Sequence, residues 1–457
     1  MDWLPALSEW PGPVFSRIVE AMVADIASGR LVRGQRLPTH RALAKALKLD
    51  LTTVTRAYGE ARRRGLIDAQ VGRGTFVSET TARQGTGPLV TKIDLTMNIP
   101  PQPVEANLDV RIAQGLKAIQ DDYGFSAFLN YQPAGGSAND VSAAVKWLRK
   151  RLPEAQAANV VIYPGNQAIL FNALLTLTSP GDVVLTEALT FPGVKTAAAE
   201  LGLRLVSVAM DRDGVLPDEL AKACKQHKPV VVYLTPTQHN PTTATLAPKR
   251  RAAIAETIRR SGTILIEDDA YGALEPTIQP LAALIPERTY LAVGLAKCIA
   301  PALRVSYLLA PGAAAAERMK QSLQATMLMP PPLMVALATR WLQSGVADKI
   351  IAAIRGEARG RQAMAAKILK GVAYQCQPNA HHIWLPMPPH WPRSDFVAYC
   401  VQQGLAVVGD EAFAVEEGAP SGVRVSLGAA RSRAELAQAL QFLAQTLKSG
   451  RQSLPLV

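Results

Sequence analysis

Hydrophobic and polar residues follow two different periods along this chain, and the change between them predicts its organisation. Between residues 14 and 26 apolar side chains recur every three or four positions, which predicts an amphipathic helix that ends near Gly29. From residue 139 onward, apolar runs of strand length alternate with helical patterns, which predicts βαβ units and a mostly parallel sheet. Beyond about residue 346 the pattern changes to a helix, short strands and a last helix over 433–448, typical of a smaller α+β domain. The chain is therefore expected to be an α/β protein with a small helical unit at its N-terminus.

The N-terminal unit is predicted to contain two more helices and a β-hairpin. Thr39 can cap a second helix with the sequence HRALAKAL, and Asp50 a third that begins LTTVTRAY. Residues 66–77 contain two strand-like runs around a Gly-Arg-Gly turn. The third helix has an apolar stripe at Val54, Ala57, Tyr58 and Ala61, and on the opposite face Thr52, Arg56 and Arg63. Two short helices with a tight connection, the second exposing hydroxyls and a guanidinium, suit reading of the DNA major groove.

Charge and composition agree with this picture. The 457 residues carry a net charge of +12, and residues 1–78 hold 12 Arg or Lys against 7 Asp or Glu, a balance of +5. Such a balance favours a polyanionic partner. Four widely spaced cysteines without a CxxC pair argue against a metal site or a disulfide framework. No basic leader or 18-residue apolar span is present, so we expect a soluble, cytoplasmic protein.

Composition also suggests where the domains divide. Residues 79–92 are rich in Thr, Gly and Ser and have no apolar period, which is typical of a flexible linker. The predicted domains are an N-terminal unit over 1–78, a large domain over 93–345 and a small α+β domain over 346–457.

The N-terminal unit resembles a known family of DNA-binding proteins. Residues 14–77 are similar to the winged helix of GntR-type transcription factors, with the pattern GxxxxGxxLPxxRxLAxxLxxxxxTVxxAYxxLxxxGLIxxxxGxGTFV nearly intact. The family often has Arg where this chain has Leu51, which bears on base preference. The resemblance implies that Arg41, Thr52, Thr53, Arg56 and Arg73 contact double-stranded DNA.

Residues able to hold pyridoxal phosphate follow several of the predicted strands. Lys297 comes just after the apolar run TYLAV, where a desolvated amine could attack an aldehyde to give a Schiff base. Asp268 ends the run TILIED and could pair with a pyridine nitrogen, while Asp269 is expected to be solvated. Arg304 could bind a phosphate, and Arg424 a substrate carboxylate.

Other candidates would complete such a site. Asn166 and Gln167 begin a predicted helix, whose N–H groups could bind the phosphate. Phe191 could stack on the ring, and Asn240 with Tyr271 could bond its 3-oxygen. Taken singly, these features have ordinary interpretations: a solvated loop lysine, a surface ion pair, a helix cap, a core aromatic and a turn asparagine.

The order of the motifs carries a second resemblance. GNQAIL, TFPG, TPxxxNPT, EDDAY, GLAKxxxPxLRVSY and VRVSLG follow one another as in the fold-type I aminotransferase family, over residues 93–457. This resemblance implies the roles above for Lys297, Asp268, Asn240, Tyr271, Phe191, Arg304 and Arg424. It also implies a homodimer in which Tyr131 reaches the neighbouring subunit's phosphate. The chain departs from the family pattern at His239, Thr243, Leu295 and Ala296.

A winged helix followed by an aminotransferase-like body is the arrangement of MocR-type regulators within the GntR family. It implies a pyridoxal-phosphate-dependent transcription regulator that senses an amine, an amino acid or a B6 vitamer through an aldimine at Lys297. The alternative is a catalytically active aminotransferase of amino acids with a fused DNA-binding domain. A third reading, a DNA-binding protein whose body has lost its cofactor, is disfavoured because Lys297, Asp268 and Tyr271 are all present.

Overall fold

The chain forms two separately packed units, Met1–Gly87 and Pro88–Val457, in the computed structural model. The structure describes residues 3–7, 13–27, 30–32, 34–63, 66–70, 74–77 and 92–449. Gly29, Arg73, the side chain of Arg63 and nearly all of the predicted linker lie outside that description. Within it, no helix combines the length and the apolar composition needed to cross a membrane.

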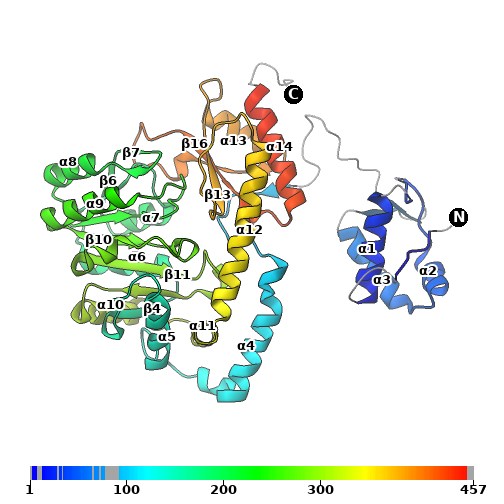
Figure 1. Cartoon of the computed structure of the whole chain (residues 1–457), viewed down its shortest axis with the longest axis horizontal. Coiled ribbons are helices and arrows are strands. Elements are labelled where there is room, and N and C mark those ends of the chain that lie inside the picture. The colour runs from blue at the N-terminus through cyan, green and yellow to red at the C-terminus, as the bar shows by residue number, and fades with distance from the viewer. Residues whose placement is uncertain are drawn as a thin grey trace. The chain divides into compact units, whose positions relative to one another are not determined.

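The N-terminal unit has the predicted three helices and hairpin. Its elements are α1 (Val14–Ala27), α2 (His40–Leu47), α3 (Leu51–Arg63), β1 (Ile67–Gln70) and β2 (Gly74–Val77) (Figure 1). Thr39 caps α2 by accepting a hydrogen bond from the Ala42 N–H at 3.2 Å, and Asp50 accepts one from the Thr52 N–H. The two strands pair antiparallel. The predicted stripe on α3 is buried at Val54, Ala57, Tyr58 and Ala61, which confirms the helical period.

A seven-stranded sheet forms the centre of the second unit. Its order is β4 (Val160–Tyr163), β12 (Ser306–Leu309), β11 (Thr289–Gly294), β10 (Ile264–Asp268), β9 (Val231–Leu234), β5 (Val183–Glu187) and β6 (Arg204–Val208). Only β12 runs antiparallel to its neighbours, so the predicted mostly parallel sheet is confirmed. Helices pack on both faces, which explains why most of these strands are continuous apolar runs.

The helices around this sheet are α4 (Leu108–Tyr123), α5 (Ala138–Leu148), α6 (Asn166–Leu177), α7 (Pro192–Glu200), α8 (Pro217–His227), α9 (Pro248–Ser261), α10 (Ala313–Met327) and α11 (Pro332–Gln343). A small hairpin joins β7 (Met210–Asp211) to β8 (Gly214–Val215). Short 3-10 turns lie at Val104–Ala106, Phe125–Phe128, Ala157–Asn159, Gly272–Leu274, Leu281–Ala283, Pro286–Arg288, Pro301–Leu303, Asp410–Ala412 and Leu427–Ala429.

The C-terminal domain is the predicted α+β unit. The long helix α12 (Val346–Ile368), yellow in Figure 1, leads into it from the large domain. Its other elements are β13 (His382–Pro386), α13 (Arg393–Gln402), β14 (Leu405–Ala406), β15 (Val408–Gly409), β16 (Gly422–Ser426) and α14 (Arg433–Ser449). Strands β13, β16 and β15 form an antiparallel sheet.

One segment lies elsewhere than the sequence suggested. Strand β3 (Ile93–Asp94) pairs with β14, and both Ile93 and Leu95 are buried in the core of the C-terminal domain. Residues 93–95, which were expected to begin the large domain, therefore pack with the C-terminal domain. A two-residue strand carries no periodic signal, so only its partner strand, more than 300 residues away, reveals its position.

Candidate active site

Lys297 follows the end of β11 and is partly buried, with its Nζ donating a hydrogen bond to the Asn98 carbonyl. Burial lowers the pKa of Lys297 from 10.5 to about 8, because removing water disfavours the ammonium form. The nearby positive charge of Arg424 lowers this pKa further, while Asp268 acts in the opposite direction. The side chain is thus biased toward the neutral, nucleophilic amine that Schiff-base chemistry needs.

Asp268 ends β10, the strand next to β11, and is 8% exposed. Its carboxylate accepts hydrogen bonds from Asn166 Nδ2 at 2.7 Å and from the Tyr233 hydroxyl at 2.9 Å. Burial raises its pKa. Both donors are neutral, and no Arg, Lys or His of the described residues forms an ion pair with this carboxylate. A buried carboxylate in that position suits a cationic heterocycle such as a protonated pyridine.

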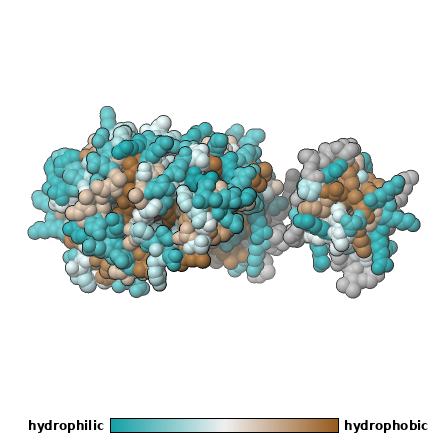
Figure 2. Space-filling view, turned by 90° about the horizontal axis from the view of Figure 1, so that it is seen from below, coloured by the Kyte–Doolittle hydropathy of each residue, from teal (hydrophilic) through white to brown (hydrophobic). Residues whose placement is uncertain are grey.

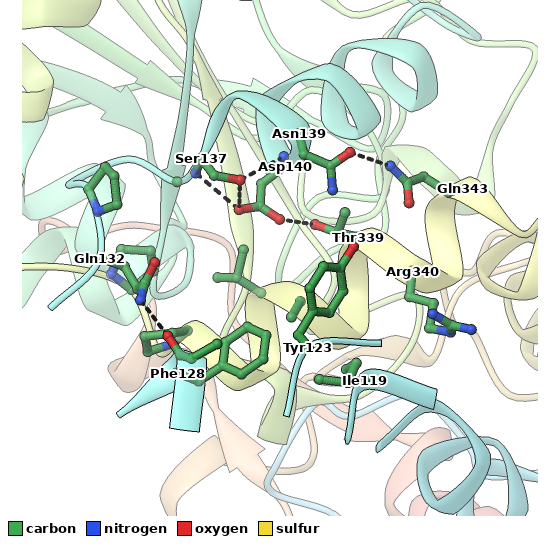
Figure 3. Close-up of a pocket in the computed structure, with 17 residues that line it drawn as sticks. Ile119, Tyr123, Phe128, Gln132, Ser137, Asn139, Asp140, Thr339, Arg340 and Gln343 are labelled. Atoms are coloured by element: carbon green, nitrogen blue, oxygen red, sulfur yellow. Dashed lines mark hydrogen bonds between the residues drawn. The ribbon is translucent and has the colours of Figure 1, made fainter. Parts of the chain in front are cut away.

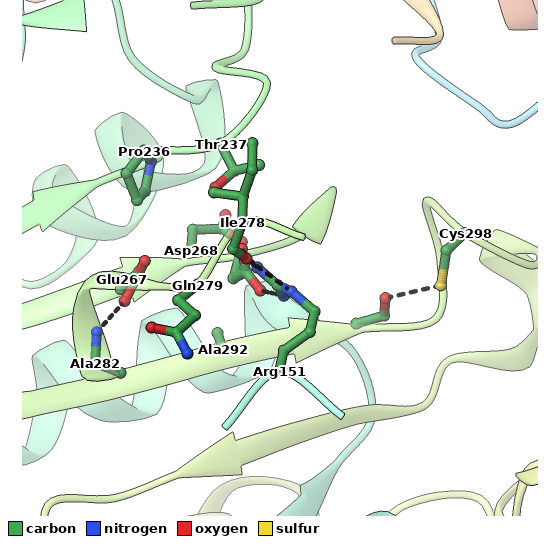
Figure 4. Close-up of polar contacts among 12 residues, drawn as sticks. Arg151, Pro236, Thr237, Glu267, Asp268, Ile278, Gln279, Ala282, Ala292 and Cys298 are labelled. Atoms are coloured by element: carbon green, nitrogen blue, oxygen red, sulfur yellow. Dashed lines mark hydrogen bonds and ion pairs between the residues drawn. The ribbon is translucent and has the colours of Figure 1, made fainter. Parts of the chain in front are cut away.

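The two acids beside Asp268 do have cationic partners. Figure 4 shows the hydrogen bond between Glu267 and Ala282 and labels Arg151. Glu267 accepts backbone hydrogen bonds from Leu281 and Ala282, both at 2.8 Å, and lies 3.9 Å from Arg251. Asp269 is fully buried in an ion pair with Arg151. The expectation that Asp269 is solvated was wrong, because α5 and the turn after it bring Arg151 under the end of β10.

Two groups that suit an anion, Arg304 and the N-terminus of a helix, meet at the start of α6. Gly165, with φ +109°, precedes the helix, and a side chain there would lie 3.2 Å from the Arg304 guanidinium. Arg304 therefore faces the N-terminus of α6, where exposed N–H groups and the helix dipole favour a phosphate. The side-chain amide of Asn166 donates its hydrogen bond to Asp268, and that of Gln167 donates to the Gly193 carbonyl at 3.1 Å. Their side-chain oxygens are buried without a hydrogen-bond partner in the described structure.

Arg424 lies on β16 and is buried. It donates to Asn240 Oδ1 at 2.8 Å and to the Thr96 carbonyl, and its Nε has no partner within the described residues. The Phe413 ring lies 4.9 Å from the guanidinium. An arginine with an unused donor and neutral acceptors can exchange those acceptors for a carboxylate.

Aromatic and amide groups fill the remaining walls. The Tyr271 hydroxyl accepts a hydrogen bond from Asn98 Nδ2 at 2.9 Å, and burial raises the pKa of Tyr271. Phe191 precedes α7 and packs partly buried against the core around Gln167 and Gly193. The structure thus brings Lys297 and the other cofactor and substrate candidates, except Tyr131, into one region.

Tyr131 lies in an exposed segment and keeps 81% of its surface. Beside this segment is a cavity of about 320 Å³ lined by Tyr123, Phe128, Asp140 and Thr339 among others (Figure 3). None of the predicted site residues lines it. Figure 2 shows one face of the molecule, on which hydrophobic side chains lie among hydrophilic ones. The chain segment that precedes Tyr131 also exposes the apolar side chains of Tyr123, Phe125 and Leu129.

Several residues of this region were missed from the sequence. Asn98 links Lys297, Tyr271 and His382, and Tyr233 holds Asp268. His381 Nε2 lies 2.6 Å from the Lys297 carbonyl, and burial lowers the pKa of His381 to about 4. Polar residues next to an apolar strand pattern are a signal from which such residues can be found, as with His381 just before β13 and His382 at its start.

In the N-terminal unit, four of the five predicted DNA contacts are described, while Arg73 lies outside the described residues. Arg41, Thr52 and Arg56 are exposed. The hydroxyls of Thr52 and Thr53 donate to Asp50 at 2.7 and 3.2 Å. The Arg56 guanidinium lies 4.0 Å from the centre of the Phe15 ring on α1, a cation–π contact that links this exposed arginine of α3 to α1.

Comparison with known proteins identifies both units. Residues 90–443 match the family model for aminotransferase class I and II, and residues 15–77 match that for bacterial regulatory proteins of the gntR family. The HTH-type transcriptional regulator YdeF of Bacillus subtilis is 28% identical over 98% of this chain and 97% of its own. YjiR of Escherichia coli, also named an HTH-type transcriptional regulator, is 24% identical over 65% and 69% of the two chains.

Solved structures show the same fold for the body. An archaeal alanine:glyoxylate aminotransferase superposes with a TM-score of 0.72, at 24% identity over 79% of this chain and 91% of its own. The α-aminoadipate aminotransferase LysN of Thermus thermophilus gives 0.71, at 22% identity over 78% and 92%. The chain belongs to the aminotransferase class I and II family and joins that fold-type I body to an N-terminal gntR-family DNA-binding domain, the MocR-type arrangement.

Proposed function

We propose that this protein is a transcription regulator that holds pyridoxal phosphate at Lys297 and changes its DNA binding when an amine, an amino acid or a B6 vitamer reaches that site. The observation that carries the proposal is Asp268, which is buried without an ion-pair partner among the described residues and is close enough to Lys297 to raise the pKa of the lysine. A protonated ring nitrogen supplies the missing charge. The protein acts in the cytoplasm, as a homodimer on double-stranded DNA.

Each candidate residue has one task toward the cofactor. Lys297 supplies the amine, Asp268 keeps the ring nitrogen protonated, and Asn240 with Tyr271 bonds the ring 3-oxygen. Phe191 covers one ring face. Arg304 and the N–H groups of Asn166 and Gln167 hold the phosphate, together with Tyr131 of a second copy. When bound, pyridoxal phosphate supplies an electrophilic carbon and an electron sink. Arg424 takes the carboxylate of an amino-acid ligand.

The same contacts suggest how ligand binding at this site changes DNA binding. Arg424 donates to the Thr96 carbonyl, and Lys297 to the Asn98 carbonyl. Both acceptors lie a few residues after the linker that leads to the DNA-binding unit. A ligand carboxylate on Arg424, with Lys297 engaged by the cofactor, removes two hydrogen bonds that hold residues 96–98. The linker is then anchored differently, which alters how the two DNA-binding units reach paired half-sites.

The test measures DNA binding and cofactor binding separately. Fluorescence anisotropy with the DNA upstream of the protein's own coding sequence is recorded with and without pyridoxal phosphate and a panel of amino acids. We expect the affinity of the wild type to change with ligand, and Lys297→Ala to bind DNA but not respond. Lys222→Ala, an exposed lysine on α8, is the control. A Lys297→Ala variant that responds like the wild type refutes the proposal.

A working aminotransferase is the second candidate, because a Schiff-base lysine, a ring-nitrogen acid and a carboxylate-binding arginine are all in place. Lys297 would then carry the proton between the substrate carbon and the cofactor carbon. Mixing the protein with amino donors and following absorbance distinguishes the two functions. Rapid and complete conversion to the pyridoxamine form by many donors supports the enzyme, and slow or absent conversion supports the regulator.

A further inference from the structure

A second cavity lies under the cofactor region, between the end of α5, the turn Gly272–Leu274, the end of β11 and the start of α12. Its volume is about 210 Å³. One wall is apolar and consists of Trp147, Leu148, Leu152, Val293 and Ile351. The other wall is charged and carries Lys150, Arg151, Arg355 and Asp348. None of the residues assigned to the cofactor or to the DNA lines this cavity.

The charges on the polar wall do not cancel. Lys150 pairs with Asp348 at 2.6 Å, and Arg151 pairs with Asp269 behind the wall. Arg355 is half-buried, and its side chain forms no ion pair or hydrogen bond with any residue in the described part of the chain. One positive charge therefore remains uncompensated beside an apolar surface. None of its guanidinium nitrogens is among the buried side-chain atoms that lack a hydrogen-bond partner in the described structure, so water reaches the group, and a ligand carboxylate can take the place of that water.

We propose that this cavity binds a small monocarboxylate with an apolar body. The carboxylate sits on the Arg355 guanidinium, whose planar fork donates two parallel hydrogen bonds. The apolar body lies against Trp147 and the aliphatic wall, where burial of nonpolar surface stabilises it. The small volume limits the ligand to about the size of one aromatic ring. Because Arg151 also holds Asp269, the residue next to Asp268, the ligand lies one ion pair away from the cofactor acid.

Isothermal titration calorimetry with benzoate tests the site, with benzyl alcohol as the neutral ligand of similar shape. We expect benzoate to bind the wild type at least tenfold more tightly than benzyl alcohol. Arg355→Ala should weaken benzoate binding at least tenfold, since a charge-assisted hydrogen bond is lost. Alanine favours the helix at this position of α12, so the variant is expected to fold. Lys349→Ala, an exposed cation on the same helix outside the cavity, is the matched control and should bind as the wild type does.

Arg424 could also attract benzoate, so Arg424→Gln is titrated in parallel. Binding that persists in Arg424→Gln and is weakened in Arg355→Ala supports the cavity. Four results overturn it: no benzoate binding by the wild type, equal affinity for benzyl alcohol, full affinity in Arg355→Ala, or loss of binding only in Arg424→Gln. Thermal melting of each variant shows that loss of binding is not loss of the fold.

Discussion

The reactivity of Lys297 follows from its burial and from the charges near it. Burial and the nearby Arg424 lower its pKa from 10.5 to about 8. At pH 7 about 9% of the side chain is then the neutral amine, against about 0.03% for a lysine with the ordinary value. The neutral amine is the nucleophile, so Lys297 should react with an amine reagent on the order of a hundredfold faster at pH 7 than an ordinary lysine of equal access and intrinsic reactivity.

Competitive acetylation of the cofactor-free protein measures this quantity. A trace of labelled acetic anhydride is added at pH values from 6 to 11, and the peptide that contains Lys297 is quantified by mass spectrometry. The labelling rate should rise with pH and level off above about 8 in the folded protein. The same peptide labelled in urea is the control, and its rate should level off only near the ordinary value of about 10.4.

Two variants should move the midpoint of the labelling curve, the pH at which half of Lys297 is the neutral amine, in opposite directions. Arg424 lowers the pKa of Lys297, so Arg424→Gln should raise the midpoint. Asp268 raises that pKa, so Asp268→Asn should lower the midpoint, because a stabilising negative charge is gone. A folded-state midpoint near 10, or a shift of both variants in the same direction, would refute the electrostatic reasoning.

Three further outcomes are expected. Gly165→Ala should weaken pyridoxal phosphate binding in a fluorescence titration, because the added methyl group would lie 3.2 Å from the Arg304 guanidinium. Gly181→Ala is the control, since Gly181 also has a positive φ but has open space around it. Equal affinities of the two variants would contradict the proposed phosphate site. Asp269→Ala should lower the free energy of unfolding, measured in urea, by about 3–5 kcal/mol, because it leaves Arg151 buried without its ion-pair partner. A decrease below about 1 kcal/mol would argue that the ion pair does not stabilise the fold. Arg56→Ala should weaken operator binding by about 1–3 kcal/mol in anisotropy and leave cofactor absorbance unchanged, and unchanged DNA affinity would exclude this arginine as a contact.

The fold and the strand-end residues could be predicted from sequence for a physical reason. Parallel strands end at one edge of the sheet, so residues that follow β10 and β11 must lie near one another. Local patterns could therefore place Lys297 and Asp268 in one region. The partners of these residues had no such signal. Asn98 is 199 residues away from Lys297, and Arg151 is 118 residues away from Asp269, so only tertiary packing joins them.

Two departures from the family pattern, Leu295 and Thr243, have clear surroundings in the structure. Leu295 is fully buried in the core of the large domain, so its side chain contributes to packing and has no polar group to offer an anion. Thr243 has φ +65°, a left-handed conformation that disfavours a β-branched residue by about 1–2 kcal/mol. Hydrogen bonds between the Thr243 N–H and the His239 carbonyl, and between the His239 N–H and the Ala244 carbonyl, hold this turn. The same turn carries Asn240, the acceptor for Arg424. The strained Thr243 therefore lies close to Asn240, which would lose its hydrogen bond to Arg424 if a ligand carboxylate took its place. Such strain favours a change of conformation when a ligand binds.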